Sequence, residues 1–237
     1  MRPPFRLSIE KLKKTYAERM VLDIDELVLD SGHAYALVGP NGSGKSTLLK
    51  ILAGAIDASE GGVVVHGESN PEELRVGFMP QKSYSFGFSV FRNVALALEG
   101  SGLTRSEIGE RVTSALDIVG ISDLADARGS SLSGGEAQRM ALARILVRDL
   151  DVALLDEPTA SMDITATMLV EDALANYREK TGCLLLVATH APSQARRIAN
   201  SIVMLSEGKV VECGDAQDVL LQPTSAQGRE FLSYWSV

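Results

Sequence analysis

Residues 39–47 read Gly-Pro-Asn-Gly-Ser-Gly-Lys-Ser-Thr, and these residue types in this order could bind phosphate. They meet the pattern Gly-x-x-x-x-Gly-Lys-Ser/Thr. Glycines let successive backbone N–H groups approach an anion closely. Lys45 would bring a positive charge to the outer phosphates, and the Ser46 hydroxyl could complete the ligand shell of Mg²⁺. The stretch therefore predicts a nucleotide-binding loop made of Gly39, Pro40, Asn41, Gly42, Ser43, Gly44, Lys45, Ser46 and Thr47.

A second stretch, Leu-Ser-Gly-Gly-Glu at residues 132–136, opens a strongly helical run. Its Ser133, Gly134 and Gly135 would form a helix N-terminus, where free N–H groups and the helix dipole favour anions. One chain with two phosphate-binding helix ends suggests that a nucleotide is held between two molecules.

An acidic pair, Asp156 and Glu157, ends the apolar run at residues 152–155. The carboxyl ends of parallel strands form the usual ligand edge of such sheets. We therefore expect Asp156 to hold Mg²⁺ and Glu157 to polarise the water that attacks a γ-phosphate. The alternative is that Asp-Glu-Pro simply ends a strand at the surface. The phosphate loop earlier in the chain favours the catalytic interpretation.

The elements that must position these residues alternate between strands and helices. Apolar patterns predict strands over 5–9, 22–29, 35–38, 61–65, 76–79, 152–155 and 184–188, and a hairpin at 203–212 that turns at Glu207–Gly208. Helical spacing appears at 45–56, 90–98, 105–119, 135–146, 164–177 and 192–199. The segment from 83 to 149 is almost wholly helical. We infer an α/β core interrupted by a helical insert.

Composition limits the possible partners. The chain has 237 residues, a formal net charge of −8 and a pI near 5.0, so it has no general attraction to nucleic acid. No apolar run approaches the ~20 residues of a membrane-spanning helix, and no signal peptide is recognisable. Cys183 and Cys213 lack metal-site spacing and are expected to stay reduced. These features predict a cytoplasmic location.

Taken together, the motifs resemble those of the ATP-binding subunits of ABC transporters, over nearly the whole chain. The phosphate loop is followed by Gln81 after a strand, then by 132–136, the acidic pair, Ser161-Met162-Asp163 and His190. The resemblance implies a P-loop NTPase core with a mainly parallel sheet, N-terminal antiparallel β strands and a helical subdomain. It also implies a single domain over 1–237, with a nucleotide-binding core at 1–82 and 150–237 and the helical subdomain at 83–149.

The resemblance also implies roles for single residues. Tyr16 would stack on adenine; the alternative is a half-exposed tyrosine at a strand edge. Gln81 would sense Mg²⁺ and the attacking water, and His190 would contact the γ-phosphate. Asp163 would couple two nucleotide sites across a dimer. The implied catalytic residues are Glu157, His190, Lys45 and Gln81, and the implied Mg²⁺ ligands are Ser46, Gln81 and Asp156.

The partners expected from the resemblance are proteins. A second copy would bind head to tail, so that its residues 133–135 close on the ATP of the first copy. Integral-membrane permease subunits would hold the chain at the inner face of the cell membrane, and an extracytoplasmic solute-binding protein would belong to the same system. The aromatic residues at 83–91 form either the core of the insert or a groove for the permease; they are Tyr84, Phe86, Phe88 and Phe91.

Function is expected to be ATP hydrolysis that powers transport. Residues 127–131 lack the acidic pattern of exporters, which favours an importer. Residues 132–146 and 190–199 are similar to those of oxyanion importers of the tungstate and phosphate kind. The alternatives are a soluble ABC-type ATPase in iron–sulfur assembly or another non-transport role, and a regulator with weak hydrolysis. The sequence leaves open the cargo, the permease, the direction of transport and whether the ATPase is a homodimer or heterodimer.

Overall fold

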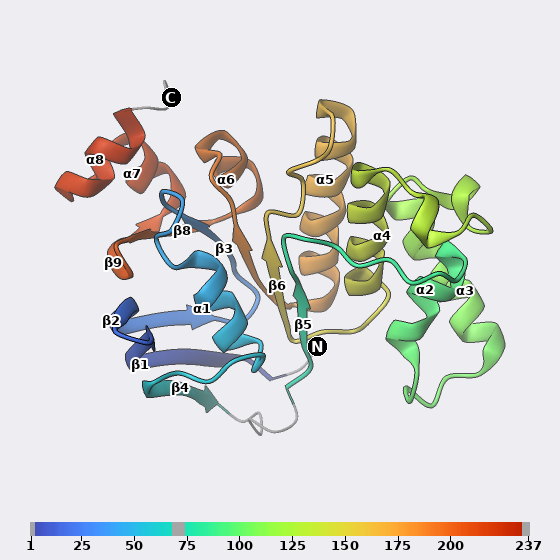
Figure 1. Ribbon diagram of the computed structural model, residues 1–237, viewed down its shortest axis with the longest axis horizontal. Helices are drawn as coiled ribbons and strands as arrows, with labels where there is room; N and C mark the ends of the chain where they lie inside the picture. The colour runs from blue at the N-terminus through green and yellow to red at the C-terminus, as the bar shows by residue number, and fades with distance from the viewer. Residues whose placement is uncertain (1–2, 68–73, 234–237) are drawn as a thin grey trace. The chain divides into compact units, whose positions relative to one another are not determined.

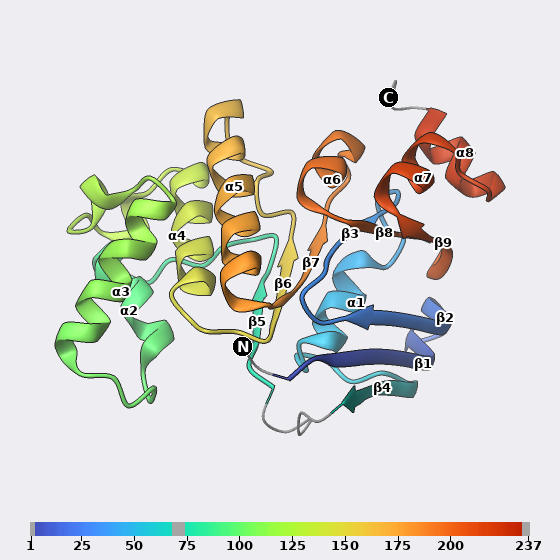
Figure 2. The same ribbon diagram turned by 180° about the vertical axis from the view of Figure 1, so that it is seen from behind.

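The computed structural model describes residues 3–67 and 74–233 (Figures 1 and 2). The chain divides into two compact units. The first contains residues 1–78, 151–157 and 178–237, and the second contains residues 79–150 and 158–177. This division follows contact density. The functional boundaries expected from the sequence stay a prediction, because residues 158–177 group here with the helical segment.

The first unit contains an antiparallel sheet, as predicted for the N-terminal strands. Its strand order is β2-β1-β4, with β1 at Phe5–Tyr16, β2 at Arg19–Asp30 and β4 at Glu60–Gly67. Alternate residues of β1, such as Leu7 and Ile9, are buried. The register shifts between Glu10 and Lys13 opposite β4, which marks a bulge at the position where Lys11 has a φ of 48°.

A six-stranded, mainly parallel sheet forms the rest of the first unit's framework. The order is β5-β6-β7-β3-β8-β9, at Val76–Met79, Val152–Asp156, Leu184–Ala188, Ala34–Val38, Ser201–Ser206 and Lys209–Asp215. Every residue of β3, β6 and β7 is buried, as expected for parallel strands covered on both faces. The predicted hairpin joins β8 to β9 in antiparallel pairing, and Glu207 and Gly208 have φ values of 50° and 80°. Both lie in the left-handed region, as tight hairpin turns require.

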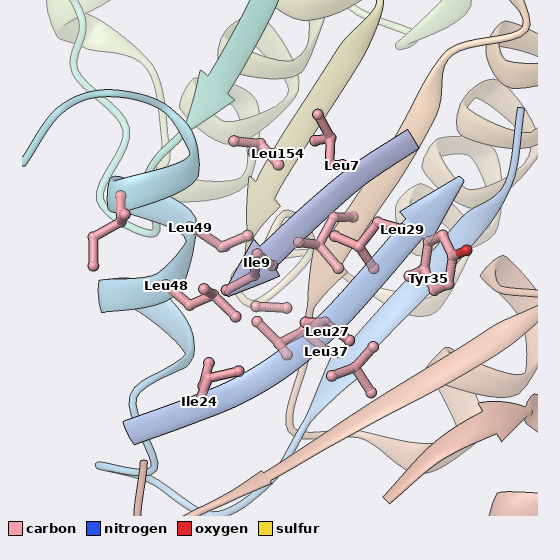
Figure 3. Packing of buried hydrophobic residues seen from close by; sticks show 14 of the residues in the cluster. Leu7, Ile9, Ile24, Leu27, Leu29, Tyr35, Leu37, Leu48, Leu49 and Leu154 are labelled. Atoms are coloured by element: carbon pink, nitrogen blue, oxygen red, sulfur yellow. The ribbon is translucent and has the colours of Figure 1, made fainter. Parts of the chain in front are cut away.

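The core of this unit lies between its two sheets and α1 (Lys45–Leu52). Figure 3 shows Leu48 and Leu49 of α1 beside Ile9 of β1. Leu48 and Leu49 are fully buried. Three further helices belong to this unit: α6 (Pro192–Ile198), α7 (Ala216–Leu221) and α8 (Ala226–Ser233). Helical spacing predicted α6, whereas α7 and α8 were not expected from the sequence.

The second unit is helical. It contains α2 (Val90–Ala95), α3 (Arg105–Ile118), α4 (Gly134–Leu146) and most of α5 (Ile164–Thr181), with short 3₁₀ turns at Leu96–Leu98, Ser122–Leu124 and Gly129–Ser131. Thr104 and Glu107 form a capping box that starts α3. Within residues 3–67 and 74–233, no helix is both long and apolar enough to cross a bilayer.

The buried face of α1 anchors the helix that follows the phosphate loop. Truncating the fully buried Leu48 to alanine removes core contacts and leaves a cavity, so the free energy of unfolding should fall by about 2–5 kcal/mol. Lys50 is an exposed residue of the same helix, and its change to alanine should alter that energy by less than about 0.5 kcal/mol. Urea unfolding of both variants measures the difference. Equal losses would contradict this account of the core.

Candidate functional site

The phosphate loop joins β3 to α1, and its glycines are required by geometry. Gly39, Gly42 and Gly44 have φ values of 144°, 81° and 105°, which side chains rarely permit. A Cβ atom on Gly39 would lie 2.0 Å from the carbonyl oxygen of Leu205. One on Gly44 would lie 2.5 Å from Cδ2 of Leu22. The loop therefore takes a conformation that other residues cannot adopt, with its backbone packed closely against β2 and β8.

The start of α1 is suited to an anion. Gly44 is its N-cap and supplies no side-chain hydrogen bond, and the first turn contains no acidic residue. The first N–H groups of a helix have no partner within the helix, and they carry the positive end of its dipole. Among the described residues, none forms a hydrogen bond with the buried Oγ of Ser43. A phosphate oxygen would supply the acceptor that these donors need.

The Lys45 side chain is hydrogen-bonded to the backbone of the phosphate loop. Its Nζ donates to the carbonyl oxygens of Gly39, at 2.7 Å, and Pro40, at 3.0 Å. Burial lowers the pKa of the Lys45 ammonium, while the negative charges of Glu157 and Asp156 act in the opposite direction and raise it. The Lys45 ammonium is therefore close enough to the predicted acidic pair, Asp156 and Glu157, to be attracted by both carboxylates.

The structure brings Asp156, Glu157 and His190 to this same edge. Asp156 is the last residue of β6 and is buried. Glu157 follows with a φ of 51°, and its N–H donates to the carbonyl of Ala188 at the end of β7, at 3.0 Å. The Oε1 atom of Glu157 lies 2.9 Å from Nδ1 of His190. A carboxylate that is fixed in this way and hydrogen-bonded to an imidazole can act as a general base toward water.

A cavity of about 650 Å³ adjoins the phosphate loop. One wall is made by residues 19–21 and 40–43, and another by Gln227, Glu230 and Phe231 of α8. The sequence analysis missed these three residues. Two of them are polar, so they form no apolar helical pattern, and the buried positions of α8 are only Gly228 and Leu232. Tyr16 lies at the end of β1, outside this lining, and is 48% exposed, with the Lys14 ammonium 5.0 Å from its ring centroid. Stacking of Tyr16 on adenine stays a prediction.

The second predicted motif lies in the helical unit. Ser133 caps α4, because its Oγ accepts from the N–H of Glu136 while the Glu136 carboxylate accepts from the Ser133 N–H. The Ser133 hydroxyl also donates to the Glu136 carboxylate, at 2.7 Å, and this hydrogen bond, together with the one from the Ser133 N–H, lowers the pKa of Glu136. The Ser-x-x-Glu pattern could have revealed this capping box from the sequence.

A second pocket, of about 400 Å³, is lined by residues 133–136 together with Ser161, Met162 and Asp163. A Cβ atom on Gly135 would lie 2.8 Å from the Ser161 carbonyl oxygen. Asp163 caps α5, since its Oδ1 accepts from the Ala166 N–H at 2.8 Å. Gln81 is exposed and also belongs to this second unit. Residues 133–136 and residues 161–163, which are at least 25 residues apart in the sequence, thus line one pocket.

Magnesium is the cofactor that the predicted ligands would hold. In the described part of the chain, no three His, Cys, Asp or Glu side chains converge in a metal-binding cluster. Mg²⁺ needs no such cluster, because it keeps several water ligands and binds through one or two protein oxygens together with phosphate oxygens. The Ser46 hydroxyl in the first turn of α1 and the buried Asp156 carboxylate are oxygen ligands of that kind.

The sequence of this chain is similar to those of known proteins. The chain matches the family described as "ABC transporter" over residues 22–160. It is 40% identical to "Phosphate import ATP-binding protein PstB 2" of Natronomonas pharaonis, over 90% of this chain and 81% of that protein. It is 38% identical to "Tungstate uptake system ATP-binding protein TupC" of Peptoclostridium acidaminophilum, over 87% of this chain and 97% of that protein.

A solved structure supports the same assignment. It is a dimeric post-hydrolysis state of the ATP-binding cassette MJ0796 bound to ADP and Pi. This chain matches it with a TM-score of 0.80 and 25% identity, over 89% of this chain and 98% of that one. Fold, motifs and relatives agree. The chain belongs to the ABC transporter family and is an ATP-binding, ATP-hydrolysing subunit.

Proposed function

We propose that this ATPase powers an importer, and that Glu157 and His190 activate the water that hydrolyses ATP. The observation that carries the catalytic part is the 2.9 Å contact between these two side chains at the edge of the sheet where the phosphate loop begins. Positioning and charge neutralisation supply most of the rate in phosphoryl transfer. Lys45 and the loop N–H groups would oppose the negative charge that develops on the γ-phosphate. Bound Mg²⁺, held by Ser46, Asp156 and Gln81, would neutralise part of that charge.

Two copies would form the working unit. Each ATP would lie between the phosphate loop of one copy and residues 133–135 of the other, and Asp163 would link the two sites. The pocket that unites 133–136 with Asp163 supports this arrangement, because it offers a helix N-terminus and a neighbouring loop on one face. A solved relative is described as dimeric. Hydrolysis would then require dimerisation, since the residues of one chain complete the site of the other.

A permease would bind at the aromatic residues that precede α2. Tyr84, Phe86 and Phe88 are 69%, 52% and 39% exposed, and they lie within five residues of one another. Large exposed apolar side chains in one place mark interaction sites. We propose that this surface receives a helix of an integral-membrane permease, which would hold the chain at the inner face of the membrane, and that a solute-binding protein delivers cargo to that permease.

The cargo we propose is an oxyanion such as tungstate. Relatives named for phosphate import, tungstate uptake and molybdate/tungstate import support this choice. A relative named for methionine import is 33% identical, so the ATPase sequence alone discriminates weakly between cargoes. The cargo would be recognised by the binding protein and the permease rather than by this chain.

Replacing Glu157 with glutamine tests the catalytic role. The amide keeps the size of the side chain but cannot take a proton from water, so kcat for ATP should fall by about 10²–10⁴-fold. ATP binding should persist, and the variant should accumulate as a dimer with ATP in size-exclusion chromatography. Glu179, which is 69% exposed, provides the matched control Glu179→Gln. Normal turnover in Glu157→Gln would remove Glu157 from the mechanism.

Mixing two inactive variants tests the head-to-tail arrangement. Ser133→Arg should leave the phosphate loop of its own chain intact but block the partner's ATP, whereas Lys45→Ala should impair its own site only. A heterodimer then contains one complete site, so each heterodimer should show up to about half of the activity of a wild-type dimer. ATPase assays on mixtures measure this. Ser133→Asp keeps an N-cap residue, and its melting temperature separates loss of the cap from loss of phosphate contact. Confirmed heterodimers without activity would contradict sharing of sites.

Isolation of the tagged chain from gently solubilised native membranes tests the transport role. A multi-span permease should co-purify, as identified by mass spectrometry. The double change Tyr84→Ala and Phe86→Ala should lower its recovery by about tenfold or more, because interface aromatics commonly contribute over 1 kcal/mol each. Ile118, 44% exposed on α3, gives the control Ile118→Ala. If only soluble partners appear with the wild-type chain, the transport role fails and the ATPase assignment survives.

A further inference from the structure

One buried amide holds the aromatic loop (residues 83–89) from the inside. The Asn93 side chain is fully buried. Its Oδ1 accepts from the Phe86 N–H at 2.9 Å, and its Nδ2 donates to the carbonyl oxygens of Phe86, Phe88 and Ser89 at 3.0–3.1 Å. The oxygen and the nitrogen of the amide thus both bind backbone groups of the loop. This side chain holds the backbone at Phe86, Phe88 and Ser89 behind the exposed aromatic rings.

Arg144 of α4 joins the same network. Its Nη2 donates to Oδ1 of Asn93, its Nε donates to the Asn93 carbonyl at 3.0 Å, and its Nη1 donates to the Tyr84 carbonyl at 2.6 Å. The guanidinium also lies 5.5 Å from the ring centroid of Phe86. Desolvation by burial lowers the pKa of Arg144, as expected for a cation compensated by neutral acceptors. A planar group with a rigid fork of donors is needed to reach three acceptors at once.

This network lies at one end of α4, and the residues proposed to contact a partner's ATP, 133–135, lie at the other. Ser133 caps the N-terminus, and Arg144 is in the last turn of the 13-residue helix. A helix of this length is about 20 Å long. Its internal hydrogen bonds make it a stiff connection between its ends. We call the hydrogen bonds among Asn93, Arg144 and the loop backbone the Asn93–Arg144 node. This node attaches the aromatic loop to α4, the helix that also carries Ser133–Gly135 at its N-terminus.

A second connection runs through the backbone. The N–H groups of Val90 and Phe91 donate to the carbonyls of Ala127 and Ala125, and the Gly129 N–H donates to the Phe88 carbonyl at 2.8 Å. A Cβ atom on Gly129 would lie 2.7 Å from Nδ2 of Asn93. The segment that leads into Ser133 thus packs against the same amide. Asn93 therefore contacts both connections between the aromatic loop and Ser133.

We propose that Asn93 and Arg144 are positioning residues that transmit the response to ATP from residues 133–135 to the aromatic loop. The inference rests on the proposed function, in which residues 133–135 close on a partner's ATP. Because the node makes the loop and α4 one body, closure at the N-terminus of α4 moves the loop with it. Without the node, the loop would keep its aromatic residues but would no longer follow the helix.

Hydrogen exchange on the full-length chain, with ATP as the only added ligand, tests this proposal. All proteins carry Glu157→Gln to hold the ATP-bound state. ATP should slow exchange both at residues 133–138 and at the aromatic loop. Arg144→Lys keeps the charge but loses the planar fork, so the response at 133–138 should persist. The amides of the aromatic loop, Phe86 above all, should exchange about tenfold faster and lose their response to ATP.

Matched variants separate transmission from general damage. Arg111 forms an exposed ion pair with Asp149 at 2.9 Å in the same unit, and Arg111→Lys should leave both responses unchanged. Should Arg144→Lys lower the melting temperature of the whole chain, Arg144→Gln provides a second, uncharged variant that keeps one donor.

The outcomes distinguish failure of the Asn93–Arg144 connection from failure of the proposed dimer. An unaltered loop response in a folded Arg144 variant overturns the inference. A loop that ignores ATP in the Glu157→Gln parent, while 133–138 responds, overturns it as well. If ATP leaves 133–138 unprotected in the parent, the proposed dimer itself fails, and the inference falls with it.

Discussion

The parallel pairing of β6, β7 and β3 is the constraint on which the ATP site depends. In this register, Ala188 of β7 lies level with Asp156 on one side and with Leu37 on the other. The three strands therefore end together, and the phosphate loop, the acidic pair and His190 begin at the same edge. A slip of one residue would turn each side chain to the opposite face of the sheet. Complete burial of the strands on both faces makes such a slip costly.

The buried strands could be predicted from the sequence because each is a short, continuous apolar run. Short apolar runs bounded by Gly, Asp and Thr fit parallel strands, and β3, β6 and β7 lie where they were expected. The ends of elements were harder to predict. Helix α1 stops at Leu52 rather than at residue 56, because Gly54 with a φ of 66° ends the helical path. Strand β1 continues to Tyr16 past several lysines, since pairing with β2 satisfies its backbone whatever the side chains are.

The candidate site likewise has parts that could be predicted from the sequence and parts that could not. The phosphate loop could be predicted because its short glycine pattern is required sterically: side chains at Gly39 and Gly44 would collide with Leu205 and Leu22. The contact between Glu157 and His190 spans 33 residues of sequence, and the Arg144–Asn93 contact spans 51. No local pattern marks such pairs, because they depend on where separate elements finally pack. Asn93 belongs to no motif, and its importance appears only once its four partners are in place.

The two carbonyl partners of Lys45 have a consequence for the rate at which nucleotide exchanges. The carbonyl oxygens of Gly39 and Pro40 orient the ammonium at the loop, but they do not neutralise its charge, which stays available to an anionic ligand. An arriving triphosphate exchanges one set of oxygen partners for another, and little chain entropy is lost in the encounter. When ammonium and phosphate partners are already oriented, binding orders fewer groups, which favours rapid exchange of nucleotide at this loop.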